Sequence, residues 1–225
     1  MTVTVLSGHG RYEDPWHDLA GTSHRVALLL AALGLAVEVR GLPKEALTHL
    51  DQTDLLVVNC AGNHLDPSFD GNDDAWADAR AGLAAYLARG GPILALHGAG
   101  SAFADNPTWH GLIGPEWVDG VSFHPPIDLA QIEVRQAAHP IADGLSDFTV
   151  WDERYSNLKL HRAVEPYLVH TLDGVVQPLA WAHTEGASRI VYDALGHGLE
   201  SYDSPMRARL LQREAQWCLG LPLTA

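Results

Sequence analysis

Three residues able to move a proton or bind a metal ion stand where predicted strands end. His97 follows the apolar run PILAL and opens the small-residue turn HGAGS. Glu153 lies in WDERY, and His197 lies in ALGHG, just after SRIVYDA. An imidazole can act as general acid or base near neutral pH, and a carboxylate can accept a proton or hold a sugar hydroxyl. Each of the three has a structural alternative, such as a histidine that closes a turn or a solvated acidic strand end.

The loop GHGRYEDPWHD after the first predicted strand is a candidate binding loop. It is long for a connection from a strand to a helix, and it carries His9, His17 and Asp18. Trp16 offers a flat apolar ring on which a sugar can stack, although the loop can instead fold on this ring. We expect Trp16 and His17 to bind substrate.

The alternation of side chains in an extended segment puts Tyr155 on the same face as Glu153 and puts Asp152 on the other. Tyr155 is therefore a third expected substrate-binding residue. His124 in FHPP and His183 in WAHTE also follow short predicted strands, and for each alone we favour a structural role.

These histidines and carboxylates raise the question of a metal cofactor. Three protein ligands and one water make a catalytic zinc site, so a divalent metal such as zinc is one hypothesis. The sequence has no close H-x-x-x-H pair and no cysteine cluster, so it leaves both the presence and the identity of a metal unknown. It also lacks the G-x-G-x-x-G and G-x-x-x-x-G-K-[ST] patterns of nucleotide sites and the G-x-S-x-G of serine hydrolases.

Composition narrows the choice of partner. The chain has 225 residues and a formal charge of −14, which opposes binding to nucleic acid and to anionic membranes. A small neutral sugar ligand fits this charge. Two cysteines, no signal segment and no long apolar segment predict a cytoplasmic protein. Whether it forms a homo-oligomer is left open.

The first half of the chain alternates strands and helices, which predicts a mostly parallel sheet flanked by helices, a three-layer α/β fold. In such sheets ligands bind at the carboxyl ends of the strands, so the loops Ser7–Asp18, Cys60–Asp74 and His97–Asn106 deserve most interest. The predicted strands are Thr2–Leu6, Leu35–Arg40, Asp54–Asn59 and Pro92–Leu96. The predicted helices are His24–Gly34, with its N-cap supplied by Gly21, Thr22 and Ser23, then Pro43–Leu50 and Asp73–Arg89.

The second half reads as short strands and a last helix, Pro205–Trp217. No linker, repeat or low-complexity stretch separates the halves, so we expect a single domain over residues 1–225. The predicted strands are Val118–Val121, Asp128–Val134, Val150–Tyr155, Tyr167–Thr171, Pro178–His183 and Arg189–Ala194.

The order and spacing of several segments resemble the ThuA-like family, named for trehalose utilisation. The similar segments run nearly from end to end: VLSGHGRYEDPWHD, DLLVVNCAGN, GGPILALHGAGSAF, WHGLIGPEWV, HPIADGLSDF with the later DERY, and PLAWAHTEGASRIVYDALGHG. This resemblance implies a flavodoxin-like sheet of the class I glutamine amidotransferase type. In those relatives the turn occupied here by His97 carries a nucleophilic cysteine, which works with a later histidine and a glutamate.

The resemblance therefore implies catalytic roles for His97, His197 and Glu153 and argues against a cysteine-dependent amidotransferase. It also suggests carbohydrate utilisation. Our leading interpretation is an enzyme acting on a disaccharide, a glycoside or a keto-sugar derivative, by acid–base or metal-assisted chemistry. Two alternatives stay open: a non-catalytic sugar-binding or accessory protein that kept the fold, and a metal-dependent hydrolase of a non-sugar substrate.

Overall fold

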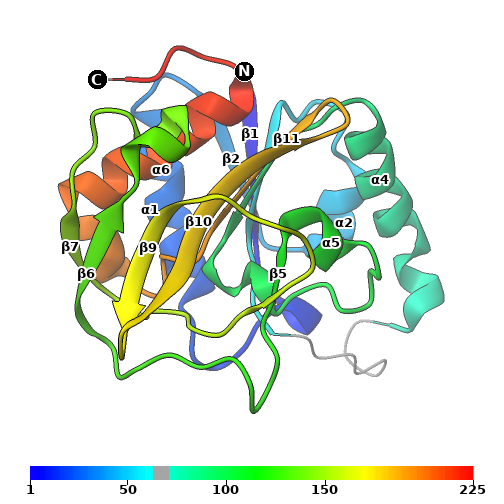
Figure 1. The fold of residues 1–225 in the computed structure, drawn as a ribbon. Coiled ribbons are helices and arrows are strands. Elements are labelled where there is room, and N and C mark those ends of the chain that lie inside the picture. Colours follow the sequence, from blue (N-terminus) through cyan, green and yellow to red (C-terminus); the bar gives the residue numbers. More distant parts are fainter. Residues whose placement is uncertain (63–70, 225) are drawn as a thin grey trace.

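A computed structural model describes residues 1–62 and 71–224. Nine of their strands form one sheet in the order β2-β1-β3-β4-β11-β10-β9-β6-β7, which twists through the centre of the molecule (Figure 1). The sheet divides at β11 into a parallel part and an antiparallel part. This division matters because the candidate residues sit where the two parts meet.

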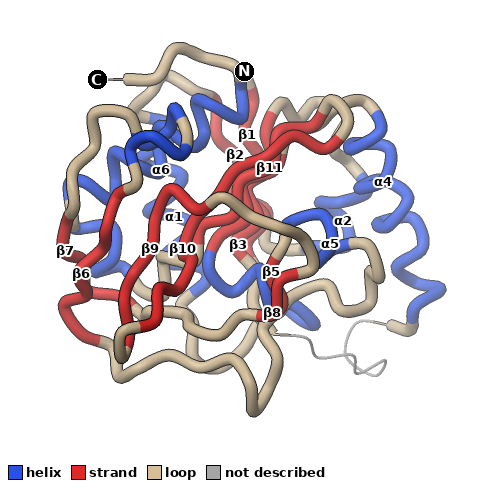
Figure 2. The backbone as a smooth tube through the Cα atoms, viewed as in Figure 1, coloured by secondary structure: helices blue, strands red, loops and turns tan. Residues whose placement is uncertain are grey.

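The parallel part is built from segments that the sequence marks as buried on both faces. All residues of β3 and β4 are buried, and their apolar runs leave no face for solvent. Figure 2 shows these strands at the centre of the backbone tube. The five strands are β1 (Thr2–Ser7), β2 (Ala36–Arg40), β3 (Leu55–Asn59), β4 (Ile93–Leu96) and β11 (Ser188–Asp193).

The antiparallel part extends the sheet through four strands, which are β10 (Val175–Glu185), β9 (Pro166–Leu172), β6 (Asp128–Val134) and β7 (Phe148–Asp152). β6 and β7 alternate buried and exposed residues, as expected for strands with one face on the core. A separate two-stranded sheet pairs β5 (Pro115–Glu116) with β8 (Lys159–Leu160).

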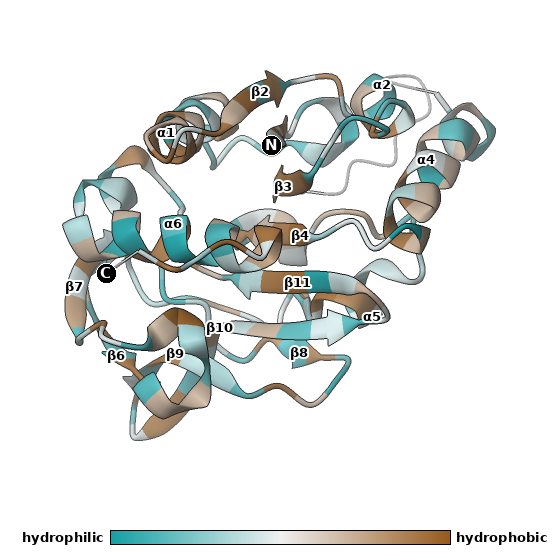
Figure 3. Ribbon diagram, turned by 90° about the horizontal axis from the view of Figure 1, so that it is seen from above, coloured by the Kyte–Doolittle hydropathy of each residue, from teal (hydrophilic) through white to brown (hydrophobic). Residues whose placement is uncertain are grey.

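Helices cover both faces of the sheet. Figure 3 shows α1 and α6 on one side and α2 and α4 on the other, and each of these pairs is in contact. The helices are α1 (Leu19–Ala31), α2 (Pro43–Thr48), α4 (Ala77–Ala88), α5 (Trp109–Ile113) and α6 (Pro205–Leu219). The three-layer α/β class predicted from the sequence is confirmed, and the antiparallel extension completes it.

Two local predictions were wrong. The first helix is capped by Asp18, whose carboxylate accepts a hydrogen bond from the backbone N–H of Gly21 at 2.9 Å. Thr22 and Ser23 instead lie inside the helix, where their hydroxyls hold the side-chain amide of Asn59 at 2.9 Å each. Residues 118–121 form a turn rather than a strand, because the N–H groups of residues 121 and 122 both bond to the carbonyl of Val118.

The loops expected to carry function follow the parallel strands. Ser7–Asp18 leaves β1, and His97–Asn106 leaves β4. Part of Cys60–Asp74 lies outside the described residues. None of the described helices is long and apolar enough to cross a lipid bilayer.

Candidate functional site

His97 occupies a tight and well-supported turn at the end of β4. Its φ of +39° lies in the left-handed region that residues with a Cβ rarely adopt. The carbonyl of His97 accepts a hydrogen bond from the Tyr192 hydroxyl at 2.9 Å. The next residue, Gly98, packs so closely on the loop after β3 that a Cβ there would lie 2.5 Å from the Cβ of Ala61. The backbone around His97 is therefore held in a costly conformation, a common feature of functional sites.

Four side chains from distant parts of the chain converge at this turn. His17, His97, Glu153 and His197 each present one potential ligand atom, and these atoms all lie within 4.8 Å of one another. They follow β1, β4, β7 and β11 respectively. The carboxyl ends of the parallel strands thus supply three histidines, and the antiparallel strand β7 supplies the carboxylate.

Three of the separations are close to the spacing of ligands around one metal ion. The Nε2 atoms of His17 and His97 are 3.1 Å apart. Oε2 of Glu153 is 3.5 Å from Nε2 of His97, and Oε1 is 3.3 Å from Nδ1 of His197. Two ligands at about 2.1 Å from a tetrahedral zinc ion are about 3.4 Å apart. The donor set of three imidazoles and one carboxylate is one that zinc and similar divalent ions accept.

The partners of the two facing imidazoles fix where their protons lie. Nδ1 of His97 is 2.6 Å from the carbonyl oxygen of Ala194, which can only accept a hydrogen bond. Nδ1 of His17 is 2.7 Å and 2.8 Å from the two carboxylate oxygens of Asp14, which also only accept. Each neutral ring therefore carries its proton on Nδ1 and presents a lone pair at Nε2. The two Nε2 atoms face each other at 3.1 Å, with the Tyr155 hydroxyl 2.9 Å from the one on His97, and a cation bound by both nitrogens would relieve their repulsion.

Tyr155 packs against His97 and is a buried hydrogen-bond donor. Its hydroxyl oxygen is 2.9 Å from Nε2 of His97, and only 5% of the residue is exposed. Burial raises the pKa of Tyr155 well above its ordinary value, and nearby Tyr192 and Glu153 add to the effect. The hydroxyl therefore stays protonated and can donate to His97 or to a bound group.

Glu153 is the only carboxylate of the cluster. Burial opposes its charge, but the contacts with His197 and His97 outweigh burial and hold the pKa of Glu153 well below its usual range. The same hydrogen bond raises the pKa of His197, against the effect of burial. Burial lowers the pKa of His17, although Asp14 partly compensates. The cluster therefore combines an ionised carboxylate, Glu153, with one imidazole of raised pKa, His197, and one of lowered pKa, His17.

Asp152 ties two of these segments together without touching the cluster's centre. Its carboxylate accepts hydrogen bonds from the N–H groups of Gly196 and His197 at 2.8 Å and 3.0 Å. It also accepts from the Ser201 hydroxyl at 2.6 Å and from the N–H of Glu153 at 2.9 Å. Because Asp152 is fully buried, these bonds fix the loop after β11 to the end of β7.

His124 and Asp14 belong to the site, although the sequence analysis gave neither residue a role there. Nε2 of His124 is 3.3 Å from Oε1 of Glu153, and 36% of its side chain is exposed. Phe123 pairs with Ser156 in an isolated β-bridge, which brings His124 to the site. The spacing of Asp14 three residues before His17 was the available signal for its role. The Trp117 ring packs beside these residues, with its centroid 4.7 Å from that of Tyr155 and 6.1 Å from that of His124.

Other candidates lie apart from the cluster. Trp16 is 74% exposed on the first loop. His9 pairs with Glu13, and His183 lies on β10, with Nε2 2.6 Å from Nη1 of Arg162. Cys60 and Cys218 are both buried free thiols, and burial raises the pKa of each well above its usual value.

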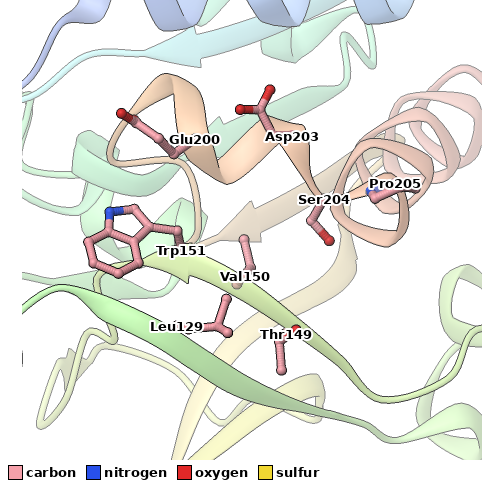
Figure 4. A pocket seen from close by; sticks show the side chains of 8 residues that line it. All are labelled: Leu129, Thr149, Val150, Trp151, Glu200, Asp203, Ser204 and Pro205. Atoms are coloured by element: carbon pink, nitrogen blue, oxygen red, sulfur yellow. The ribbon is translucent and has the colours of Figure 1, made fainter.

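A separate open cavity of about 540 Å³ lies beside the antiparallel edge of the sheet (Figure 4). Trp151 and Leu129 supply apolar surface, while Glu200 and Asp203 supply carboxylates. None of the four clustered residues lines it. This cavity is therefore separate from the histidine cluster, although Trp151 precedes Asp152 directly.

The family model ThuA, described as trehalose utilisation, matches residues 2–218. The chain belongs to the ThuA family. It is therefore related to trehalose utilisation, and the resemblance noted in the sequence is confirmed. Among curated proteins, no relative matches the chain.

Solved structures of similar fold include a putative ThuA-like protein from Parabacteroides merdae, with a TM-score of 0.77 at 16% identity. The match covers 100% of this chain and 91% of that one. A cytoplasmic protein from Salmonella typhimurium matches with a TM-score of 0.61 at 15% identity, over 98% of both chains. PurLQS from Thermotoga maritima matches with a TM-score of 0.58 at 12% identity, over 97% of this chain and 96% of that one.

These likenesses concern the fold. ThuA-like proteins and class I glutamine amidotransferases share the sheet and the flanking helices of this ThuA protein. The turn after β4 holds His97, and both cysteines of the chain are buried elsewhere.

Proposed function

We propose that this ThuA protein is a metal-dependent enzyme acting on a sugar, with His17, His97, His197 and Glu153 as the metal ligands. One observation carries the proposal: the Nε2 atoms of His17 and His97 face each other at 3.1 Å while both Nδ1 atoms are engaged with acceptors. A divalent cation between the rings turns this repulsion into two coordinate bonds. A bound ion of this kind polarises carbonyl and hydroxyl oxygens and lowers the pKa of a bound water.

The protein's own side chains have distinct tasks in this scheme. Asp14 and the Ala194 carbonyl orient the His17 and His97 rings, and such outer contacts also make the rings better ligands. Glu153 supplies negative charge to balance the cation. Tyr155 holds its proton on the hydroxyl next to His97, where it can donate to a substrate oxygen.

The family's link to trehalose utilisation supports a carbohydrate as substrate. A disaccharide, a glycoside or a keto-sugar derivative offers adjacent oxygens that a divalent cation can bind together. The Trp117 ring beside the cluster and the exposed Trp16 on the first loop supply flat apolar surfaces that suit a sugar face. The net charge of −14 favours a neutral substrate over an acidic one.

The test begins with metal content. Purified protein is stripped with a chelator, and zinc, manganese, iron, cobalt and nickel are then titrated by calorimetry. The wild-type chain is compared with His97→Ala and with His24→Ala, a matched control because His24 is an exposed residue of α1. We expect His97→Ala to lose the tight metal equivalent and His24→Ala to keep it, with unchanged far-UV circular dichroism in both.

Each metal-loaded form is then assayed against disaccharides, glycosides and their keto derivatives. We expect turnover that the chelator abolishes and the metal restores, and His97→Ala should lower kcat/KM at least about 100-fold. Full turnover of the chelated protein would refute the metal-dependent mechanism. Sugar binding without turnover would instead identify an accessory protein, and turnover restricted to esters, amides or phosphates would identify a hydrolase of non-sugar substrates.

A further inference from the structure

A second group of possible metal ligands lies outside the site described above. His110 in α5, Glu116 in β5 and His161 just after β8 present ligand atoms that all lie within 4.8 Å of one another. Oε2 of Glu116 is 2.6 Å from Nε2 of His161, and the rings of His110 and His161 stack with centroids 5.8 Å apart. Lys159 also contacts Oε2 of Glu116, at 2.7 Å.

The backbone holds these three residues in place before any ion binds. Glu116 and Lys159 are paired in the β5–β8 ladder. The carbonyl of Gly114 accepts the N–H of His161 at 2.8 Å, and the N–H of Gly114 donates to the carbonyl of His110 at 2.8 Å. Gly114 therefore links the end of α5 to the segment after β8. Its φ of +108° is open to glycine but strained for other residues.

One of the three donor atoms lacks a partner among the described residues, and the other two are open to solvent. Nε2 of His110 is buried and has no hydrogen-bond partner within the described part of the chain. An imidazole nitrogen left unpaired in this way loses its hydration and gains nothing in return. His161 and Glu116 have side chains that are 31% and 27% exposed, so an ion can reach the cluster from solvent.

We propose that His110, Glu116 and His161 form a second, structural metal site for zinc or a similar divalent ion. Two imidazoles and one carboxylate are a common donor set for zinc, and water can supply the fourth ligand. Ligands around a tetrahedral ion stand about 3.4 Å apart, so a pair separated by the full 4.8 Å has to close by about 1.4 Å when the ion binds. Lys159 turns away to solvent when the cation replaces it beside Glu116.

Such an ion would fasten the β5–β8 pair to α5. Trp117 directly follows Glu116, and its ring packs on Tyr155 in the first site. An ion at the second site would therefore stabilise the position of Trp117 beside the first site without donating any atom to that site. The two metal sites can be occupied independently, so this inference does not rest on the proposed function.

Zinc stoichiometry tests the inference on the full chain. Metal-free protein is titrated with zinc by calorimetry, and bound zinc is counted after desalting. The variants are His110→Asn with His161→Asn, and, in a separate protein, His97→Asn with His197→Asn. His24→Asn serves as the control for the loss of a histidine elsewhere. We expect two tight equivalents in the wild type and the control, one in each double variant and none when all four histidines are replaced.

Glu116→Gln provides a second variant that keeps the side chain's size. It should weaken the second equivalent at least about tenfold and leave the first unchanged. It should also reduce the gain in thermal midpoint that zinc gives the His97→Asn, His197→Asn protein.

Undiminished zinc binding by His110→Asn, His161→Asn and by Glu116→Gln would overturn the inference, as would binding weaker than micromolar. If His97→Asn, His197→Asn keeps both equivalents, the proposed function fails while this second site is judged separately on its own variants.

Discussion

Two clusters of ionisable side chains lie near the end of β11: Asp193, its last residue, belongs to one, and His197 in the following loop belongs to the other. The two clusters differ in how their charges are balanced. The core cluster contains Asp193, Arg207 and Glu214, all buried. Nη1 of Arg207 is 3.0 Å from Oδ2 of Asp193 and 3.9 Å from Oε2 of Glu214. Burial and the neighbouring Asp193 raise the pKa of Glu214 well above its usual value, so Glu214 keeps its proton.

In the core cluster the chain supplies its own cation, Arg207. In the histidine cluster no arginine or lysine of the described residues forms a hydrogen bond or ion pair with His17, His97 or Glu153, and the Nε2 atoms of His17 and His97 face each other at 3.1 Å. The contrast is between a network whose charge the chain balances itself and one for which we propose a bound cation. Packed titratable groups that are balanced within the chain are typical of structural networks, and groups left unbalanced are candidates for binding sites.

The largest effect that this contrast predicts is on folding. Arg207→Met leaves Asp193 buried without its cation, and we expect the free energy of unfolding to fall by about 3–5 kcal/mol. Urea denaturation followed by circular dichroism measures the change. Adding Asp193→Asn to Arg207→Met should recover part of the loss, because it removes the unpaired charge. Equal stability of the wild type and Arg207→Met would break the distinction between the clusters.

The next effect concerns metal binding. Asp14→Asn keeps an oxygen that can accept from the N–H groups of Trp16 and His17 but removes the charge facing the His17 ring. We expect metal affinity at the first site to fall about 10- to 100-fold with little change in stability. Glu13→Gln on the same loop is the matched control and should bind metal as the wild type does. Unaltered affinity in Asp14→Asn would remove Asp14 from the site.

A smaller effect is expected in the pH dependence of the metal-free protein. Glu153 raises the pKa of His197, so their interaction stabilises the fold fully below the unfolded pKa of about 6.5 and is lost as pH rises through the higher folded pKa. Comparing wild type with His197→Gln should therefore show a stability difference of about 1 kcal/mol near pH 6 that shrinks toward pH 8. The folded pKa of Glu153 lies well below its unfolded value of about 4.5. The interaction is therefore lost at the acid end only as the pH falls through that lower folded pKa.

Metal affinity should follow the opposite course. Protons compete with metal for the imidazole nitrogens, so affinity at the first site is expected to rise from about pH 6 to pH 8. Calorimetric titrations at several pH values measure this trend. A flat affinity profile would mean that the histidines are not the ligands.

The smallest effect is that of thiol modification. Cys60 and Cys218 are buried and burial raises their pKa values, so iodoacetamide should leave both unmodified in the native protein. Intact-mass spectrometry before and after treatment measures this, and urea-unfolded protein is the control. Rapid alkylation of Cys60 with loss of turnover would restore a thiol mechanism.

The sequence was informative where a residue follows a strand. PILAL followed by small residues placed His97 at the carboxyl end of a strand, and the two-residue alternation in WDERY put Glu153 and Tyr155 on one face. Both of these side chains do reach Nε2 of His97. Local periodicity and the rule for parallel sheets suffice for such predictions.

The sequence was uninformative where position depends on long-range pairing. His124 reaches Glu153 because Phe123 pairs with Ser156, a contact that no local pattern announces. The orientation of the His17 ring depends on Asp14 within an irregular loop. Thr22 and Ser23 resembled helix caps, but Asn59 from β3 uses their hydroxyls inside the core. In each case a tertiary contact overrides the local signal.

Asp152 carries a consequence for anyone who would transplant or redesign this centre. Its four hydrogen bonds join the end of β7 to the loop after β11. The distance between Glu153 and His197 is therefore set by a side chain that is not itself one of the proposed ligands. Copying the four ligand residues onto another scaffold without this buried carboxylate would reproduce the side chains but not the distances between them.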